Sequence, residues 1–376
     1  MEFRGLKAQY QKYRSEIDES IHNVLQKGHF IGGSEVQELE EQLSKYQGVK
    51  HCITCANGTE AMSLVLMAWG IKEGDAVFVP DFTFFSTAEV VALIGATPIF
   101  VDVDQGTFNM DPVKLEKSIT KVIQEGKLTP KVIIPVDLFG LPANYIEIKK
   151  IAKHHNLLIL EDSAQGFGGK IGDKNAGSFG DAGTVSFFPA KPLGAYGDGG
   201  AIFTSDDRLA ETITSLKMHG KGKNKYDNIR IGFNSRLDTI QAAVLLVKYR
   251  AFVEHELEDI NKVAKMYDDE LASIVKVPKI PQGYYSSFAQ YTIKLKHTTD
   301  RDGLHNHLLN MGIPSFVYYH KPMHKQTAFS YLKYNDDNFT ITNELCNTVL
   351  SLPIHPYLTE KEISTVVDNV KSYFNN

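Results

Sequence analysis

Residues 131–165 read KVIIPVDLFGLPANYIEIKKIAKHHNLLILEDSAQ and give the strongest indication of fold class. An apolar run at 131–140 is followed by a helical pattern at 143–155 and by a second apolar run that ends on acidic residues. Two fully apolar strands joined by a crossover helix are typical of a parallel sheet that is covered on both faces. The stretch therefore predicts an α/β fold.

The same alternation continues on both sides of this stretch. Further strand-like runs lie at residues 51–56, 76–80, 97–104, 183–188 and 199–205, and further helical patterns at 33–48, 58–70 and 83–95. Such sheets bind their ligands beyond the carboxyl ends of the strands. Polar residues that follow these strands are therefore the candidates for a functional site.

The pattern changes near Ser235. Residues 235–274 read as a long helix without Gly or Pro, and after it come a strand-like run at 285–296 and a closing helix beyond Thr359. We predict a large domain over residues 1–250, which includes an N-terminal arm, and a smaller C-terminal α+β domain over residues 251–376.

Composition excludes several classes of protein. The formal net charge is −5 over 376 residues and no basic face is evident, so we expect no nucleic-acid partner. The longest apolar run, at 88–101, is short and contains Glu89, so we expect no membrane span. The N-terminus lacks the apolar core of a signal peptide, and we expect a cytoplasmic protein.

Cys52 and Cys55 form a C-x-x-C spacing, which can mark a redox pair or half of a zinc site. Zinc needs two further ligands, and the remaining cysteine, Cys346, is distant and unpaired in the sequence. Both residues also fit a buried strand, where cysteine behaves as a small hydrophobe. We favour this second interpretation and expect no metal site.

Three candidate features follow predicted strands. Asn57, Gly58 and Thr59 open a helix, where free N–H groups suit a phosphate, although any helix cap looks similar. Asp162 ends an apolar strand, which fits an active site or a solvated strand end. Lys191 lies among aromatic, Pro and Gly residues at 186–203, where desolvation would make its amine nucleophilic, unless the amine reaches the surface.

Together these features are the parts of a pyridoxal 5′-phosphate site: a phosphate cradle, an acid for the pyridine nitrogen and an amine for the aldehyde. Phe84 supplies an aromatic ring that could stack on the cofactor. A metal hydrolase would need histidines near Asp162 in the sequence, and a nicotinamide enzyme would need a G-x-G-x-x-G motif after the first strand. Neither pattern is present.

Over essentially its full length the chain resembles the DegT/DnrJ/StrS family of sugar aminotransferases. The resemblance is carried by ANGTEA (56–61), PDFTFFSTAEVV (80–91), PIFVDVD (98–104), EDSAQGFGG (161–169), SFFPAKPLGAYGDGGAIFT (186–204), GFNSRLDTIQAA (232–243) and SLPIHPYL (351–358). It implies the aspartate-aminotransferase fold (fold type I). It also implies a homodimer in which both subunits build each active site.

The resemblance also implies roles for single residues. Lys191 matches the residue that binds the cofactor aldehyde covalently, and Asp162 the residue that pairs with the pyridine nitrogen. Gln165 matches a contact to the ring face or its oxygen, and Phe84 the aromatic residue that stacks on the ring. A small branch of dehydratases has histidine at the lysine position, so Lys191 favours transamination.

The phosphate-binding positions of the family match Gly58, Thr59 and Ser186. Asn234 matches a residue that reaches the phosphate from the neighbouring subunit. Arg236 is a candidate for holding the substrate there. The basic stretch from Lys217 to Lys225 is either a contact for a nucleotide diphosphate or a solvated loop.

Within the family, the motifs are most similar to those of enzymes that act on nucleotide-linked 3-keto sugars. They imply UDP-2-acetamido-2-deoxy-3-oxo-D-glucuronate as substrate, L-glutamate as amino donor and a role in bacterial surface polysaccharide synthesis. Where that subgroup has His-Tyr, this chain has Tyr318-Tyr319, so a dTDP-linked 3-keto-6-deoxyhexose or a 4-keto sugar stays an alternative. Tyr318 and His324 are further substrate candidates.

Two alternatives from other classes stay open. The first is a non-catalytic regulator that keeps the fold and binds a ligand. The second is an enzyme of the same fold with another chemistry, such as a decarboxylase or a cysteine desulfurase. The complete set of Lys191, Asp162, Gln165 and Ser186 argues against a regulator, because a binding protein does not need a reactive amine.

Overall fold

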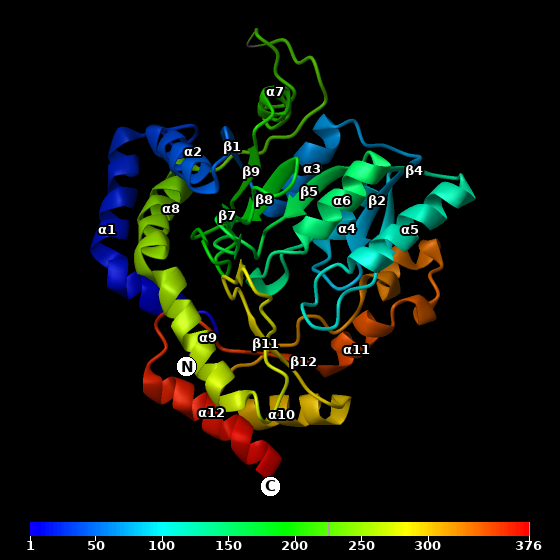
Figure 1. The fold of residues 1–376 in the computed structure, drawn as a ribbon. Coiled ribbons are helices and arrows are strands. Elements are labelled where there is room, and N and C mark those ends of the chain that lie inside the picture. The colour runs from blue at the N-terminus through cyan, green and yellow to red at the C-terminus, as the bar shows by residue number, and fades with distance from the viewer. Residues whose placement is uncertain (225, 376) are drawn as a thin grey trace.

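The computed structural model describes residues 1–224 and 226–375, and a sheet with helices on both faces forms its centre (Figure 1). Within these residues the large sheet has seven strands: β1 His51–Cys55, β2 Asp75–Pro80, β3 Thr97–Val101, β4 Thr129–Ile133, β5 Leu158–Asp162, β8 Ala182–Ser186 and β9 Gly200–Thr204. Their spatial order is β1-β9-β8-β5-β4-β2-β3. Only β9 pairs antiparallel with its neighbours, so the predicted mostly parallel α/β fold is confirmed.

The helices of this part are α1 Leu6–Lys27, α2 Ser34–Gln47, α3 Gly58–Ala68, α4 Ser86–Leu93, α5 Pro112–Glu125, α6 Tyr145–His155, α7 Asp207–Leu216 and α8 Thr239–Ala251. Alternate residues of β2 enter different cores. Val77 and Val79 pack with residues of α3, α4 and α7, whereas Ala76 and Phe78 pack with residues of α5 and α6. Burial on both faces is the reason why the strands read as unbroken apolar runs.

Helix α1 was not predicted from the sequence. It packs along α8, where Ile17 contacts a small apolar cluster that contains Val244 and Val247 (Figure 1). Only Gln9, Ile17 and Val24 of its 22 residues are buried. So narrow an apolar stripe gives a weak periodic signal.

The predicted long helix is confirmed as one continuous helical run. It consists of α8, the π-helical turn η2 Phe252–Glu256 and α9 Leu257–Leu271. The division at residue 250 falls inside this run and stays a prediction.

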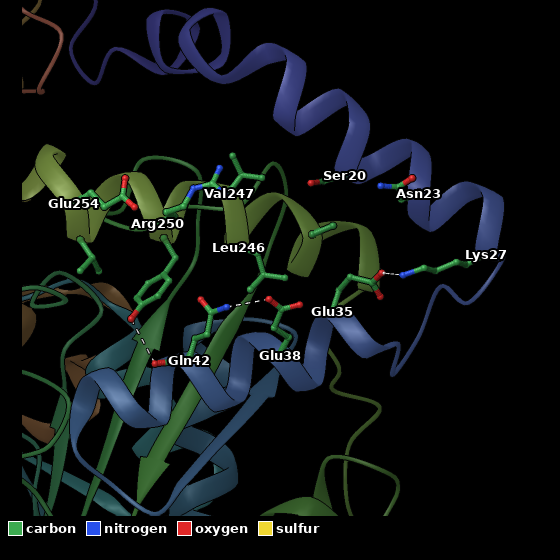
Figure 2. A pocket seen from close by; sticks show the side chains of 13 residues that line it. Ser20, Asn23, Lys27, Glu35, Glu38, Gln42, Leu246, Val247, Arg250 and Glu254 are labelled. Carbon is green, nitrogen blue, oxygen red and sulfur yellow. Dashed lines mark hydrogen bonds and ion pairs between the residues drawn. The ribbon is translucent and has the colours of Figure 1, made fainter.

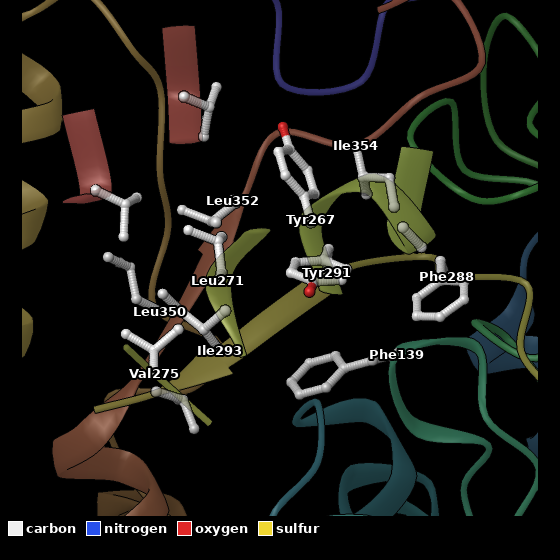
Figure 3. Packing of buried hydrophobic residues seen from close by; sticks show 14 of the residues in the cluster. Phe139, Tyr267, Leu271, Val275, Phe288, Tyr291, Ile293, Leu350, Leu352 and Ile354 are labelled. Atoms are coloured by element: carbon white, nitrogen blue, oxygen red, sulfur yellow. The ribbon is translucent and has the colours of Figure 1, made fainter. Parts of the chain in front are cut away.

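The C-terminal part packs into an apolar core that also includes residues of the large part (Figure 3). The rings of Tyr267 and Tyr291 lie 5.0 Å apart in it, and Phe139 and Phe288 extend it toward the large sheet. Strand β11 Tyr291–Lys294 pairs antiparallel with β12 Val349–Leu352, and α12 Glu360–Asn375 is the predicted closing helix.

The remaining elements are α10 Thr298–Asn310, α11 Thr340–Thr348, β6 Lys170–Ile171, β7 Lys174–Asn175, β10 Tyr284–Tyr285, η1 Leu138–Gly140, η3 Met323–Lys325, η4 Thr327–Leu332 and η5 Asp336–Asn338. Strand β10 pairs with β6, so the C-terminal part adds a strand to a hairpin of the large part. Among the described residues, no helix is long and apolar enough to cross a membrane.

Candidate active site

The candidate site lies where the carboxyl ends of β5 and β8 meet the start of α3. Asp162 is the last residue of β5 and Ser186 the last residue of β8, and these two strands are parallel neighbours in the sheet. Gly58 begins α3. The topology therefore brings together residues that are more than a hundred positions apart in the chain.

Asp162 is buried, with 3% of its surface exposed. Its Oδ2 accepts a hydrogen bond of 2.8 Å from the Thr87 hydroxyl, and its Oδ1 accepts one of 3.2 Å from the Ala164 N–H. Burial raises the pKa of Asp162, while Thr87, Ala164 and the charge of Lys191 lower it. The carboxylate is thus held in one orientation and keeps lone pairs for another donor.

Lys191 lies in an irregular segment after β8, where its backbone N–H donates to the backbone carbonyl of Phe188 at 2.9 Å. Burial lowers the pKa of Lys191, and the charge of Asp162 raises it. Each of the two groups shifts the pKa of the other. The strands β5 and β8, which Asp162 ends and Lys191 follows, are neighbours in the sheet. An amine with a lowered pKa is a better nucleophile at neutral pH.

At the predicted phosphate cradle, the start of α3 approaches the end of β8 closely. A Cβ added at Gly58 would lie 2.8 Å from Cβ of Ser186, so only glycine leaves room between the helix and the strand end. The Asn57 side chain caps α3 by accepting from the Glu60 N–H at 2.8 Å. The N–H groups of Gly58 and Thr59 have no partner inside the helix and face the end that favours anions.

Gln165 and Phe84 form another side of the site together with Tyr319. Gln165 Oε1 accepts from the Phe139 N–H at 2.8 Å, and its Nε2 donates to the Tyr319 hydroxyl at 3.1 Å. The ring of Phe84 is 54% exposed and lies 6.4 Å from that of Tyr319. A planar ligand can therefore reach Phe84.

Sequence reasoning did not assign roles to Thr87 and Tyr319. Thr87 lies on α4, and its hydroxyl is 3.1 Å from that of Thr83, which precedes the helix; both residues are buried. The sequence offered no clear signal for the bond from Thr87 to Asp162, because the two residues are 75 positions apart. The bond partner of Tyr319 lies 154 positions away in the chain, so the sequence offered no signal for it.

Asn234 and Arg236 flank the cradle. Asn234 is exposed and Arg236 is half-buried. Between them, Ser235 Oγ accepts from the N–H of Ala56 at 3.1 Å, next to the residue that caps α3. The segment thus lies beside the cradle of its own chain, and the assignment of Asn234 to the neighbouring subunit's site stays a prediction.

The two substrate candidates of the C-terminal part differ. Tyr318 is half-buried, and its ring lies 6.1 Å from that of Phe316. His324 is buried, and both of its ring nitrogens are engaged, by Asp81 at 2.6 Å and by Asp336 at 2.7 Å. His324 offers a substrate no free ring nitrogen, and its predicted substrate role gains no support.

The basic stretch is only partly accessible to a ligand. Lys217 Nζ donates to the carbonyl of Thr54 at 2.7 Å and lies 3.6 Å from Glu40, so this charge is engaged within the chain. Lys225 lies outside the described residues.

Two other features share no residue with the candidate site. A groove of about 460 Å³ lies between α1, α2 and α8, and the ion pair of Lys27 and Glu35 closes one end of it (Figure 2). Glu116, His154 and His155 lie close enough together to ligate a metal ion, on α5 and α6. Neither feature combines an amine and a carboxylate at strand ends.

The residues of the strand-end site fit pyridoxal 5′-phosphate. The glycine-lined start of α3 suits the phosphate, and the half-exposed ring of Phe84 suits a flat heterocycle. Lys191 suits the aldehyde, and the buried Asp162 suits a protonated ring nitrogen.

A sequence profile described as the DegT/DnrJ/EryC1/StrS aminotransferase family matches residues 11–371. A UDP-2-acetamido-2-deoxy-3-oxo-D-glucuronate aminotransferase from Pseudomonas aeruginosa is 42% identical, over 97% of this chain and 98% of that protein. A pleiotropic regulatory protein from Geobacillus stearothermophilus is 39% identical, over 98% and 97%. A UDP-N-acetyl-3-dehydro-alpha-D-glucosamine 3-aminotransferase from Acidithiobacillus ferrooxidans is 37% identical, over 97% and 96%.

Solved structures agree with the fold. A DegT/DnrJ/EryC1/StrS aminotransferase from Brucella abortus has a TM-score of 0.97 and 48% identity, with full coverage of both chains. A Bacillus subtilis structure with bound cofactor PMP has a TM-score of 0.87 and 30% identity, covering 97% of this chain and 82% of that one.

Proposed function

The chain belongs to the DegT/DnrJ/EryC1/StrS aminotransferase family, and on that premise we propose that it aminates carbon 3 of a UDP-linked 3-keto sugar. It is an aminotransferase with pyridoxal 5′-phosphate as cofactor. The proposed sugar is UDP-2-acetamido-2-deoxy-3-oxo-D-glucuronate and the proposed amino donor is L-glutamate. We further propose that the protein works as a homodimer in the cytoplasm, in the synthesis of a bacterial surface polysaccharide.

One structural observation carries the chemistry. Asp162 ends β5 beside the end of its parallel neighbour β8, the segment with Lys191 follows β8 directly, and Gly58 approaches the last residue of β8 so closely that only glycine leaves room there. Two relatives named for amination at carbon 3 of a UDP sugar support the choice of substrate, since each matches nearly the whole chain.

We assign the proton transfers to Lys191. With its pKa lowered by burial, the free amine accepts the proton from the donor carbon that carries the amino group, and later returns a proton to the sugar carbon. The cofactor, when bound, supplies an electron sink through its ring. Asp162 would keep the ring nitrogen protonated, because an ionised carboxylate stabilises a positive charge beside it.

The other residues bind and orient. Gly58, Thr59 and Ser186 would hold the phosphate, and Phe84 would cover one ring face. Arg236 is half-buried beside the cradle and would contact an acidic substrate. Tyr318 is the proposed sugar contact from the C-terminal part.

The alternatives are weaker. A cysteine desulfurase needs a reactive thiol, but burial raises the pKa of Cys55 and of Cys346 to about 12, and Cys52 is buried as well. A second alternative is a regulator without catalysis, since one relative is named as a regulatory protein. The set of Lys191, Asp162 and Gln165 in this chain favours catalysis, because a binding protein does not need a reactive amine.

The direct test is transfer of the amino group by the purified, cofactor-loaded protein. It is incubated with ¹⁵N-labelled L-glutamate and the UDP-linked 3-keto uronate, and NMR identifies the carbon that gains nitrogen. We expect ¹⁵N at carbon 3. Reaction only with a dTDP-linked 3-keto-6-deoxyhexose or with a 4-keto sugar would correct the substrate, and no transfer to any of them would overturn the function.

A further inference from the structure

Arg4 precedes α1 and ties the N-terminus to the C-terminal part. Its Nη1 donates to the carbonyl of Ala289 at 2.9 Å and to that of Ile354 at 3.2 Å. Both partners are neutral oxygens. They fix the position of the guanidinium without neutralising its charge.

This position borders the candidate site. Ala289 follows shortly after Ser287, whose hydroxyl donates to the backbone carbonyl of Gln165 at 3.1 Å. The ring of Phe3, next to Arg4, lies 6.3 Å from that of Tyr318. Burial lowers the pKa of Lys191, the charge of Asp162 raises it, and the charge of Arg4 lowers it. The contacts of Ser287 and Phe3 place Arg4 beside the segments that carry Gln165 and Tyr318.

The guanidinium keeps an unused donor. Its Nε is buried and has no hydrogen-bond partner among the described residues. Glu256 raises the pKa of Arg4 by its charge, but its carboxylate already accepts from Gln9 and Tyr357. Burial lowers the pKa of Arg4 to about 10, so the group stays charged at neutral pH. Arg4 is half-buried, and a charge that is partly withdrawn from water without a hydrogen-bonded anion favours an anionic ligand.

A buried cation, Lys248, lies on α8, the helix that packs along α1. Lys248 is 2% exposed, and its Nζ lies 4.9 Å from the centre of the Tyr196 ring. Burial lowers the pKa of Lys248 to about 8, while the charge of Glu256 raises it and the charge of Arg4 lowers it. Because Glu256 offsets part of this positive charge, the case for an anionic ligand rests on Arg4 and its unpartnered Nε.

We propose that the guanidinium of Arg4 binds a carboxylate of a substrate in this site. The inference rests on the proposed function, in which the amino donor and the uronate sugar both carry carboxylates. A guanidinium can meet a carboxylate with two parallel N–H bonds, and Nε is one of the donors used in that arrangement. Arg4 is then a binding residue that selects acidic substrates and takes no part in proton transfer.

The test compares Arg4→Gln and Arg4→Lys with the wild-type holoenzyme in the two half-reactions, each followed by visible absorbance of the cofactor. The donor probes are L-glutamate and L-glutamine. The sugar probes are UDP-linked 3-amino sugars with either a carboxylate or a hydroxymethyl group at carbon 5. We expect Arg4→Gln to raise KM about 10- to 100-fold for a carboxylate probe, with a smaller change in kcat. Arg4→Lys should restore part of the affinity.

The pattern identifies the source of the carboxylate. An effect on the uronate probe alone assigns the sugar, an effect on glutamate alone assigns the donor side chain, and an equal effect on both amino acids assigns their shared α-carboxylate. Arg14→Gln, on the exposed face of α1 where Arg14 pairs with Asp18, is the matched control and should leave every KM unchanged.

Two outcomes would overturn the inference. The first is an Arg4→Gln protein with wild-type KM for all four probes. The second is a higher dimer dissociation constant with unchanged KM, which would assign Nε to contacts between subunits. Failure of the wild-type protein in both half-reactions would instead reject the proposed function.

Discussion

The floor and the rim of the candidate site differ in how far this one chain completes them. The floor consists of Asp162, Thr87 and Gln165, which are all buried. The Thr87 hydroxyl donates a hydrogen bond to Asp162, and Gln165 accepts one from the backbone N–H of Phe139. The rim consists of Phe84 and Asn234, which are exposed. The difference indicates that the floor is preorganised before any ligand binds, whereas the rim is completed by cofactor, substrate or a second subunit.

The largest expected effect is the loss of activity in single variants, and mixing two such variants tests whether Lys191 and Asn234 of one site come from different subunits. Lys191→Ala should lose the visible absorbance of lysine-bound cofactor and all turnover, because no other amine replaces it. Asn234→Asp should also be nearly inactive, because its charge repels the phosphate. If Asn234 serves the partner's site, mixing the two inactive proteins restores about a quarter of wild-type activity, since half of random dimers carry one intact site.

After subunit exchange, a steady-state assay measures the activity of the mixture. In the control mixture, Lys262→Ala replaces Lys191→Ala and should retain activity. Lys262 is exposed and pairs with Glu258 and Asp259 on α9. Restoration near zero would assign Asn234 to the site of its own chain.

An intermediate effect is expected from the floor. Thr87→Val removes the hydrogen bond to Asp162 with little change in volume, and kcat should fall about tenfold. The Thr87 bond lowers the pKa of Asp162, so its loss raises that pKa. The acidic limb of the pH–rate profile should therefore move to higher pH.

Thr83→Val is the matched control, because Thr83 contacts the hydroxyl of Thr87 and not the carboxylate of Asp162. Its effect should be smaller. A Thr87→Val enzyme with an unshifted profile would contradict the idea that the floor sets the ionisation of Asp162.

The smallest effect concerns the stability of the fold around His324, which belongs to neither the floor nor the rim. His324→Gln should lower the free energy of unfolding by about 2 kcal/mol near pH 6. Burial works to lower the pKa of His324, but Asp81 and Asp336 outweigh it and raise this pKa. The stabilisation is therefore full below the ordinary histidine value and is lost as the pH rises through the folded one.

Urea denaturation at pH 6 and pH 9 measures this difference. His154→Gln, an exposed histidine on α6, is the control. Equal losses at both pH values would show that the ion pairs of His324 do not stabilise the fold.

The sequence predicted the residues that sit at strand ends. Lys191, Asp162, Gly58 and Ser186 could be found because strand periodicity locates the edge of the sheet and their chemistry is distinctive there. Their positions in one site follow from the topology alone, although their roles still need the experiments above.

The rest depends on long-range contacts that periodicity does not encode. Arg4 meets Ala289 across 285 positions of sequence, and His324 meets Asp81 across 243. Helix α1 was missed because few of its residues are buried. The sequence around His324 gives no indication of Asp81 and Asp336, the two carboxylates that engage its ring nitrogens.

A crystal structure of the protein loaded with pyridoxal 5′-phosphate tests the central claim most directly. We predict that the aldehyde carbon is bonded to Nζ of Lys191 and that the ring nitrogen lies within hydrogen-bond distance of the carboxylate of Asp162. Cofactor density attached to another residue, or a ring nitrogen facing away from Asp162, would contradict the account.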